Sequence, residues 1–477
     1  MDLDSGAGLL HRLTSYEPGR EWDVPVDDPR VRHDLTPNDL DTFPPPVKAY
    51  PPGLPVAPLP RDLPAPGGAA TAVLAGHPAD PRPLDAAQLG RVLFLGAGVV
   101  RTSERDGRRW LYRAAGSAGA RFPLEVYASV RDVPGIPDGV HWYDPVAHAL
   151  VQVGPPAGGA ATTVVVTGVP WRTGWRYAER GWRHLYWDCG TLLSQLLAAS
   201  HSAGLAPALR TLFPDARVAA LVGADEVHEY PLALLTFGGG VPAIEPSGAA
   251  TPGDLPREEF LLCTAAQRAG YRDELGAPWP AGAPLDDAPD SAPLDEVILR
   301  RGSQRRMDPA RSLPRASLEW PLRAALRGIS IPHWVAVHNV DGVAPGIYRS
   351  PDLVAPVRAG DLRAELTRIC LDQSLGGESA YVVIGATSTA GLDDRTYRDA
   401  QLAAGLVEGR LHLAAYALGA GASGMTFLDS EVPALLGEPD LATLLFTCVG
   451  VPEYASRAGG GPGAPVTIKP VTPRLAS

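Results

Sequence analysis

The sequence predicts an α+β protein in which two related domains follow one another along the chain and pack as an internal pseudo-dimer. Three observations predict this class: a length of 477 residues, an ordinary globular composition with 45% hydrophobic and 20% charged residues, and a series of motifs that occurs twice in the same order. A chain of this length has room for two or three domains with buried cores. The composition excludes a largely disordered chain.

Two of the repeated motifs carry the prediction of a tandem arrangement. The block at 179–190 begins with an acidic residue and an arginine, ends on a glycine, and recurs with the same spacing at 394–405. A pattern of arginine and leucine that begins at Arg82 recurs at Arg311. These and further matches keep one order, roughly 205 to 229 positions apart, which indicates two copies of one fold. Two copies in one chain can build an interface site within one molecule.

Proline, glycine and charge mark the boundaries between the predicted parts. Residues 40–69 are rich in proline, which favours an extended arm without its own core, and the acidic proline and alanine tract at 274–296 indicates a linker. The stretches 189–209 and 411–428 carry no formal charge, and their polar residues and glycines favour core helices over membrane spans. The predicted parts are an N-terminal arm at 1–69, a first domain at 70–245, a linker at 246–296, a second domain at 297–457 and a C-terminal tail at 458–477.

Charge and cysteine content narrow the classes of function. The 53 acidic residues outnumber the 42 basic ones, for a net charge of −11, so a nucleic-acid partner is not expected. The four cysteines are too far apart for a CxxC pair, and the N-terminus lacks the basic and apolar regions of an export signal, which together predict a cytoplasmic protein without membrane attachment. His141 and His148 belong to no metal-ligand cluster, so no metal is expected.

One basic segment opens the second repeat and has no counterpart in the first. It spells Arg300-Arg301-Gly302-Ser303-Gln304-Arg305-Arg306. Guanidinium groups supply paired donors and a serine hydroxyl supplies another, so this pattern suits a phosphate group; the alternative is a solvated basic turn. The first repeat has instead the small residues of 115–120, where a flat ligand can approach the backbone closely. The two repeats therefore predict complementary halves of one binding site.

Several spaced motifs resemble a known family. The segment 117–127, then Tyr143-Asp144-Pro145, then Tyr177-x-Glu179-Arg180-x-Trp182-Arg183 are similar to the FMN-dependent dehydrogenases of azole-containing peptide biosynthesis, the SagB-type branch of the nitroreductase fold. The resemblance covers nearly the whole chain. It implies two tandem nitroreductase-like domains that form an intramolecular pseudo-dimer.

The resemblance also implies where FMN binds. In nitroreductase-like dimers an Arg-x-Ser-x-Arg segment of one subunit holds the flavin phosphate, and a loop of the other subunit covers the ring. The residues implied here are Arg300, Arg301, Ser303 and Arg305 at the phosphate, Gly116, Ser117, Ala118, Gly119 and Arg121 over the ring, and Ala422, Ser423, Gly424 and Met425 at its edge. Because the first repeat lacks the phosphate residues and the second lacks the glycines of the covering loop, we expect one FMN per chain at the domain interface.

The catalytic assignment falls on Tyr177 with Arg176 beside it. The implied reaction removes the Cα proton of an azoline ring and passes a hydride to the flavin, so the protein has to supply a base. The family has a lysine at the position of Arg176, but a guanidinium does not deprotonate and cannot serve as a base. Tyr177 is therefore predicted to carry this role alone, unless its ring only packs under the domain interface.

The neighbouring charged residues have a structural interpretation. Glu179, Arg180 and Arg183 are predicted to form an ion-pair cluster, because an acidic residue and two arginines stand at the same spacing in the other repeat, at 394–398. Charges that persist in both copies indicate a role in the shared fold.

The predicted function is the oxidation of thiazolines and oxazolines to thiazoles and oxazoles in a ribosomally synthesised peptide of the thiopeptide kind. The implied partners are the azoline-containing precursor peptide, a cyclodehydratase and a leader-binding protein. Two alternatives stay open: an NAD(P)H-dependent flavin reductase of small nitro or enone compounds, and a non-catalytic, flavin-bound scaffold of an azole synthetase complex. The proline-rich arm favours a protein that handles peptides.

Overall fold

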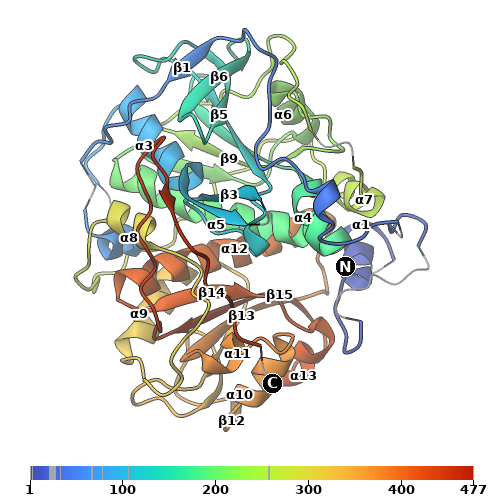
Figure 1. Ribbon diagram of the computed structural model, residues 1–477, viewed down its shortest axis with the longest axis vertical. Coiled ribbons are helices and arrows are strands. Elements are labelled where there is room, and N and C mark those ends of the chain that lie inside the picture. The colour runs from blue at the N-terminus through green and yellow to red at the C-terminus, as the bar shows by residue number, and fades with distance from the viewer. Residues whose placement is uncertain are drawn as a thin grey trace.

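Two antiparallel sheets lie one above the other, and two long helices cross between them (Figure 1). The computed structural model describes residues 2, 4–20, 28–32, 34–65, 68–77, 79–105, 107–255 and 258–475. The long helices are α5 (Gly181–Ser202) and α12 (Asp394–Ala417). The helix α12 begins at a capping box, because the side chains of Asp393 and Thr396 each bond to the other's backbone N–H.

The first sheet has seven strands in the order β1-β6-β5-β4-β7-β9-β8. Every residue of its central strands β4, β7 and β9 is buried, because helices or loops cover both faces of the sheet. The strands are β1 (Val56–Pro58), β4 (Leu124–Val130), β5 (Gly139–Asp144), β6 (Ala149–Gly154), β7 (Thr163–Gly168), β8 (Pro207–Arg210) and β9 (Tyr230–Phe237). The helices of this half are α2 (Ala70–Ala75), α3 (Ala86–Ala97), α4 (Pro170–Tyr177) and α6 (Asp215–Val222), with 3-10 turns η2 (Ala118–Ala120) and η3 (Ala178–Arg180).

The second sheet has six strands in the order β12-β11-β10-β13-β15-β14. Alternate residues of β10 belong to different core clusters: Trp334 and Ala336 face one, Val335 and Val337 the other. The strands are β10 (His333–Val337), β11 (Gly346–Arg349), β12 (Arg358–Ala359), β13 (Tyr381–Ser388), β14 (Gly421–Met425) and β15 (Leu441–Gly450). The helices of this half are α8 (Leu294–Arg300), α9 (Ala316–Leu326), α10 (Arg363–Ile369), α11 (Leu375–Glu378) and α13 (Val432–Leu436), with the 3-10 turn η4 (Asp429–Glu431).

The two sheets share one strand order. Reading β6-β5-β4-β7-β9-β8 against β12-β11-β10-β13-β15-β14 aligns the six strands of the second sheet with six of the seven strands of the first. The strands β5 and β11 even begin alike, at Gly139 with φ 158° and at Gly346 with φ 155°. The two sheets therefore correspond strand by strand over these six positions.

The long helices approach each other closely at two glycines. A Cβ built on Gly190 of α5 would lie 2.4 Å from the carbonyl oxygen of Leu402, and one built on Gly405 of α12 would lie 2.3 Å from that of Trp187. These neighbours are backbone atoms and cannot move aside, so only glycine fits at either position. The two glycines that end the repeated block thus mark the helix crossing.

The N-terminal arm and the C-terminal tail both pack against the two halves of the protein, each half being one sheet with its helices. The arm contributes α1 (Gly6–Leu13), the 3-10 turn η1 (Leu40–Thr42) and strand β1, which pairs with β6. The tail crosses from the lower to the upper half (dark red in Figure 1), where β16 (Val466–Thr467) pairs in parallel with β2 (Val99–Arg105), which in turn pairs with β3 (Arg108–Arg113). The tail is therefore an ordered strap across both halves.

Three predicted segments differ from the structure. The uncharged stretch 189–209 is helical only to Ser202, and its last residues belong to β8. The uncharged stretch 411–428 is helical only to Ala417, because Gly419, with φ 79°, ends the helix and β14 follows. The predicted linker at 246–296 is not entirely irregular, since it contains α7 (Leu261–Ala269), whose apolar face packs on α1. Among the described residues, no helix is both long enough and apolar enough to cross a membrane.

Candidate functional site

The predicted ring-covering loop joins β3 to β4. Its first residues are fixed to the end of α3, where the Ala115 N–H donates to the Gly96 carbonyl at 3.0 Å. The loop then turns tightly, with positive φ angles at Gly119 (58°), Ala120 (55°) and Phe122 (47°). Positive φ is uncommon outside glycine and costs conformational energy, so the surrounding contacts have to hold the loop in this shape.

Asp188 of α5 supplies those contacts. The Ser117 hydroxyl and the Ala118 N–H both donate to its carboxylate, and the Phe122 N–H donates to the Ser117 oxygen at 2.8 Å. Burial raises the pKa of Asp188 to about 7, and the bonds from Ser117 and Ala118 oppose that rise. Asp188 therefore ties the loop to the first long helix.

Arg301, from the second half, reaches the start of this loop. Its side chain is buried, Nη2 donates to the Ala114 carbonyl, and Nη1 lies 3.3 Å from a Cβ built on Gly116. Burial lowers the pKa of Arg301 to about 10, with the charge of Arg101 adding to the effect. Its Nε and Nη1 have no hydrogen-bond partner among the described residues. Orphaned donors on a buried guanidinium are suited to an anionic group.

The rest of the basic segment runs beside β14. The Gln304 N–H donates to the Ala422 carbonyl at 2.9 Å, and the Arg305 N–H donates to the Tyr454 hydroxyl at 3.0 Å. Ser303 and Arg305 are half-buried. The side chain of Arg300 instead points to solvent, where it pairs with Glu296 at 3.4 Å. The segment therefore places Ser303 and Arg305 near the predicted ring-edge residues of β14 and turns Arg300 outward.

Two residues of α12 complete a polar cluster around Arg301. The backbone of β14 approaches Glu408 so closely that a Cβ on Gly424 would lie within 2.2 Å of its Oε1. Burial raises the pKa of Glu408 to about 8, and the nearby Asp188 adds to the rise. His412 lies one turn further, with Nε2 3.6 Å from Glu408 Oε1, and burial lowers its pKa to about 3. Both ring nitrogens of His412 lack a hydrogen-bond partner among the described residues.

Tyr177 and Arg176, the last residues of α4, pack on the tip of the same loop. A Cβ built on Gly119 would lie 2.7 Å from the Tyr177 hydroxyl and 2.8 Å from Cδ of Arg176. The Tyr177 ring lies 4.0 Å from the ring of His184, and Arg176 donates to Asn38 at 3.1 Å. Glycine at 119 is thus required both by its φ angle and by these two side chains. Both are half-buried rather than enclosed in the core.

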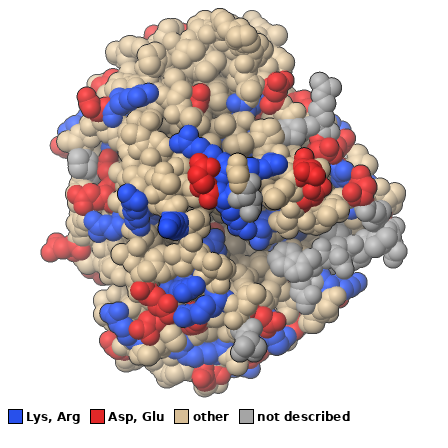
Figure 2. Space-filling model, in the orientation of Figure 1, with Lys and Arg blue, Asp and Glu red and all other residues tan. Residues whose placement is uncertain are grey.

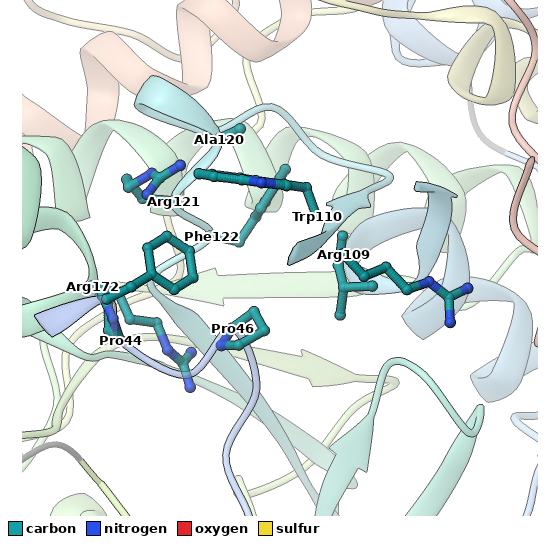
Figure 3. A pocket seen from close by; sticks show the side chains of 10 residues that line it. Pro44, Pro46, Arg109, Trp110, Ala120, Arg121, Phe122 and Arg172 are labelled. Carbon is teal, nitrogen blue, oxygen red and sulfur yellow. The ribbon is translucent and has the colours of Figure 1, made fainter. Parts of the chain in front are cut away.

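The side chain of Arg121 leaves the loop in another direction (Figure 3). Its guanidinium lies 4.6 Å from the ring of Trp110, 4.9 Å from that of Trp175 and 5.3 Å from that of Phe43. These distances are those of cation–π contacts. Arg121 and Trp110 line a small surface pocket together with prolines of the N-terminal arm.

The structure brings most of the predicted site together. The loop touches Arg301 of the second half at Gly116 and Tyr177 of the first half at Gly119, while β14 runs beside the segment that follows Arg301. Asp188, Glu408 and His412 were not predicted from the sequence. A usable signal existed for the last two, because a glutamate and a histidine four residues apart share one face of a helix.

The opposite side of the helix crossing is different. Leu193 and Leu197 follow Gly190 at the spacing at which Glu408 and His412 follow Gly405. Helix α2 ends at Gly76 where α8 ends at Arg301, and Arg327 packs against Gly76 and donates to the carbonyl oxygen of Leu74 at 2.9 Å. On this opposite side of the helix crossing, leucines therefore stand at the positions that correspond to Glu408 and His412.

In the part of the chain that the structure describes, no group of three or more His, Cys, Asp or Glu side chains is arranged to hold a metal ion.

Comparisons with known proteins agree with this fold. The sequence model of the nitroreductase family matches residues 150–239. The chain is 29% identical over 171 residues to the putative nitroreductase MJ1384 of Methanocaldococcus jannaschii, an alignment that covers 33% of this chain and 81% of that protein.

Two crystal structures of putative nitroreductases are also similar. The one from Anabaena variabilis has a TM-score of 0.70 at 23% identity and covers 94% of this chain and 100% of its own. The one from Ralstonia eutropha has a TM-score of 0.32 at 22% identity and covers 40% of this chain and 92% of its own. The Anabaena structure shows that the chain has the fold of that putative nitroreductase over nearly its whole length.

Proposed function

We propose that the protein is an FMN-dependent oxidoreductase that dehydrogenates thiazolines and oxazolines in a ribosomally synthesised peptide. One observation carries the proposal. A single loop joins the buried Arg301, whose Nε and Nη1 lack partners among the described residues, to the half-buried Tyr177. An anion-binding group and a candidate base thus stand at the two ends of one strained segment of small residues. This arrangement suits a ligand with an anionic tail and a flat reactive ring.

The residues present fit FMN. Arg301 would hold its phosphate with Ser303 and Arg305, the loop from Gly116 to Arg121 would cover the ring, and Ala422 to Met425 would lie at the ring edge. The unpaired Nε and Nη1 of Arg301 support this fit, since a buried guanidinium with unpaired donors is costly unless a ligand pairs with them. When bound, FMN would supply the hydride acceptor.

We further propose that the two halves are tandem nitroreductase-like domains that form an internal pseudo-dimer with one FMN per chain. The shared strand order and the crossing at Gly190 and Gly405 support the first part. Leu193 and Leu197, which stand in the places of Glu408 and His412, support the second. The guanidinium of Arg327 also lies on the mirror side, but it already donates to the backbone carbonyls of Leu74, Gly282 and Ala283.

The chain's own residues would divide the remaining work. Tyr177 would accept the ring Cα proton at its hydroxyl oxygen, which lies against Gly119 at the tip of the covering loop. The guanidinium carbon of Arg176 lies 5.6 Å from the centroid of the Tyr177 ring, so its positive charge would stand beside the reacting ring. Asp188 would hold the loop by its bonds to Ser117 and Ala118, so that substrate and base keep a fixed geometry. A cyclodehydratase and a leader-binding protein would deliver the precursor peptide with its azoline rings already formed.

A second candidate has its own support. The matched family model and the relatives named as putative nitroreductases favour an NAD(P)H-dependent reductase of small nitro compounds. Mass spectrometry separates the two. A cyclised peptide incubated with the purified protein should lose two hydrogens for each azoline ring oxidised. Unchanged peptide mass, together with NAD(P)H consumption in the presence of a nitroarene, would favour the second candidate. A flavin-loaded protein that does neither, but binds a cyclodehydratase, would be a scaffold.

A further inference from the structure

A cluster of arginines lies around the pocket of Figure 3, on a protein whose net charge is −11. Figure 2 shows basic side chains near the centre of the view, where Figure 1 shows β3, with an acidic side chain beside them. The arginine cluster consists of Arg109 and Arg121, which line the pocket, and of Arg105, Arg108 and Arg176, which lie beside Trp110, Phe43 and Gly119 respectively. Arg172 also lines the pocket but pairs with Glu125. Among the described residues no ion pair is found for Arg108, Arg109 or Arg121, although the exposed Glu104 lies directly across the strand pair from Arg109. A local basic surface on an acidic protein attracts acidic ligands.

Arg121 is the buried member of the cluster. Only 7% of its surface is exposed, Nε donates to the Gly119 carbonyl at 2.9 Å, and Nη1 has no hydrogen-bond partner among the described residues. The rings of Trp110, Trp175 and Phe43 hold the guanidinium in place. A buried guanidinium with an unused donor is costly unless a ligand satisfies it. A carboxylate is the group that pairs best with this geometry.

The walls of the pocket suit a peptide. Pro44 and Pro46 of the N-terminal arm lie on one side of the pocket and Trp110 of β3 on another (Figure 3), and Phe43 also lines it. Apolar and aromatic walls with a few charged groups, here Arg109, Arg121 and Arg172, are typical of sites that fix an anchoring side chain. Arg121 belongs to the loop whose Gly119 touches Tyr177, so the pocket adjoins the proposed reaction centre.

We propose that this pocket binds an acidic segment of the peptide substrate, with a carboxylate on Arg121 and a neighbouring apolar side chain against Phe43 and Trp110. This proposal rests on the function proposed above and adds a specificity determinant to it. Arg108 and Arg109, which are exposed on the same hairpin, extend the attraction to further acidic residues. Peptides with glutamate or aspartate close to the azoline are therefore the preferred substrates.

The test measures binding without turnover. Isothermal titration calorimetry of the purified full-length protein compares the blocked hexapeptide Ac-Gly-Leu-Glu-Glu-Phe-Gly-amide with its Gln-Gln counterpart. The acidic peptide should bind at least tenfold more tightly, and added salt should reduce that difference. Arg121→Gln should abolish the preference and Arg109→Gln should reduce it. The matched control Arg217→Gln, which removes an exposed arginine of the Glu245 ion pair, should leave it unchanged.

The outcomes separate this proposal from the proposed function. Equal affinity for the two peptides, or a preference that survives both Arg121→Gln and Arg109→Gln, overturns the pocket even if azolines are oxidised. Because Arg121→Gln also changes the aromatic contacts of Arg121, the Arg109→Gln variant of an exposed residue provides an independent measurement. If the protein prefers the acidic peptide but oxidises no azoline, the peptide-binding pocket is supported and the proposed reaction is contradicted. A short oligothymidylate that displaces the acidic peptide at equal concentration would instead identify a nucleic-acid surface and overturn the proposal.

Discussion

Arg183 at the start of α5 donates to Asp429 of the other half, with Nη2 2.8 Å from Oδ1, and both side chains are buried. Arg180 donates to the second oxygen of the same carboxylate at 2.6 Å. One carboxylate thus receives two arginines from the opposite half. The sequence predicted that Arg180 and Arg183 pair with Glu179, but the structure gives the two arginines Asp429 as their shared acceptor. Glu179 Oε1 instead accepts a hydrogen bond from the Arg32 N–H at 2.6 Å.

The same arrangement occurs in reverse, since Arg395 and Arg398 of α12 both donate to Asp215 of the first half. We expect Asp429→Asn and Asp215→Asn each to lower the free energy of unfolding by about 3 to 5 kcal/mol, because each leaves two buried arginines without their counter-ion. Urea unfolding measures the change. Glu245→Gln, which removes an exposed carboxylate, is the control and should stay within about 0.5 kcal/mol of the parent. Similar small effects in all three variants would contradict a role for the buried pairs.

The phosphate assignment is tested at Arg301 and Arg305. Replacing either by alanine should weaken flavin binding roughly ten- to a hundredfold, because each charge-assisted hydrogen bond contributes about 1.5 to 3 kcal/mol. Flavin absorbance after dialysis measures retention, and circular dichroism checks the fold. Arg300→Ala is a matched control, since this arginine pairs with Glu296 at the surface. If both the Arg301 and the Arg305 variants fold and stay yellow, the segment is a solvated basic turn and not a phosphate site.

The base assignment is tested by Tyr177→Phe. The variant keeps the ring and removes the hydroxyl, so we expect the rate of azoline oxidation to fall by about 10² to 10⁴ with flavin content unchanged. Stopped-flow absorbance of the flavin measures the rate. Tyr271→Phe, on a tyrosine remote from the loop, is the control. A parent-like rate in the Tyr177 variant would place the base elsewhere.

Arg176→Lys gives a complementary readout at the neighbouring position. Lysine can lose its proton in a partly buried site, whereas arginine cannot. We therefore expect activity to hold or rise if this position contributes chemically, and the pH profile of kcat to change. A large loss of activity would show instead that the guanidinium itself is needed, for example through its bond to Asn38.

Asp188 gives a prediction about pH. Burial raises its pKa to about 7, so the folded state holds this proton over a range in which the unfolded chain, with an aspartate pKa near 4, has released it. Stability due to this group therefore falls as pH rises from about 4 to about 7. Relative to Asp188→Asn, the parent should lose on the order of a few kcal/mol across that window. Urea midpoints at several pH values measure the difference, and Asp62→Asn at the surface should leave it near zero. Parallel profiles for parent and Asp188→Asn would show that burial does not retain the proton.

Flavin stoichiometry tests the single-site proposal. Flavin released from denatured protein should amount to one per chain, because Leu193 and Leu197 replace the polar groups on the mirror side. Absorbance against protein concentration measures the ratio. Two flavins per chain would contradict a site on one side only.

The sequence predicted the fold class better than its local details. The spaced repeat predicted a duplicated strand order, because motifs such as 179–190 and 394–405 sit at helix starts, where capping and ion pairs constrain the residues. It missed β14, since Gly421 to Met425 is apolar and short and carries no strand signal that separates it from a preceding helix. It also predicted no strand in the tail at 458–477, because a strand of two residues pairs through its backbone and leaves no side-chain pattern.

The site shows the same limit. Gly119 and Arg301 could be singled out from the sequence, since each belongs to a segment that differs between the repeats. Asp188 could not, because its role depends on the path of a loop that lies some seventy positions earlier in the chain. Contacts of that kind follow from tertiary packing, which composition and spacing do not encode.

The meeting of Gly190 and Gly405 has an evolutionary consequence. In an assembly of two identical chains, one mutation beside such a crossing changes both symmetric sites at once, because both are translated from the same codon. Here the two sides are encoded separately, so Leu193 can arise without altering Glu408. Selection can then act on each side alone: one can be kept for chemistry, while the other becomes a packing surface and is removed from the constraint of binding anything.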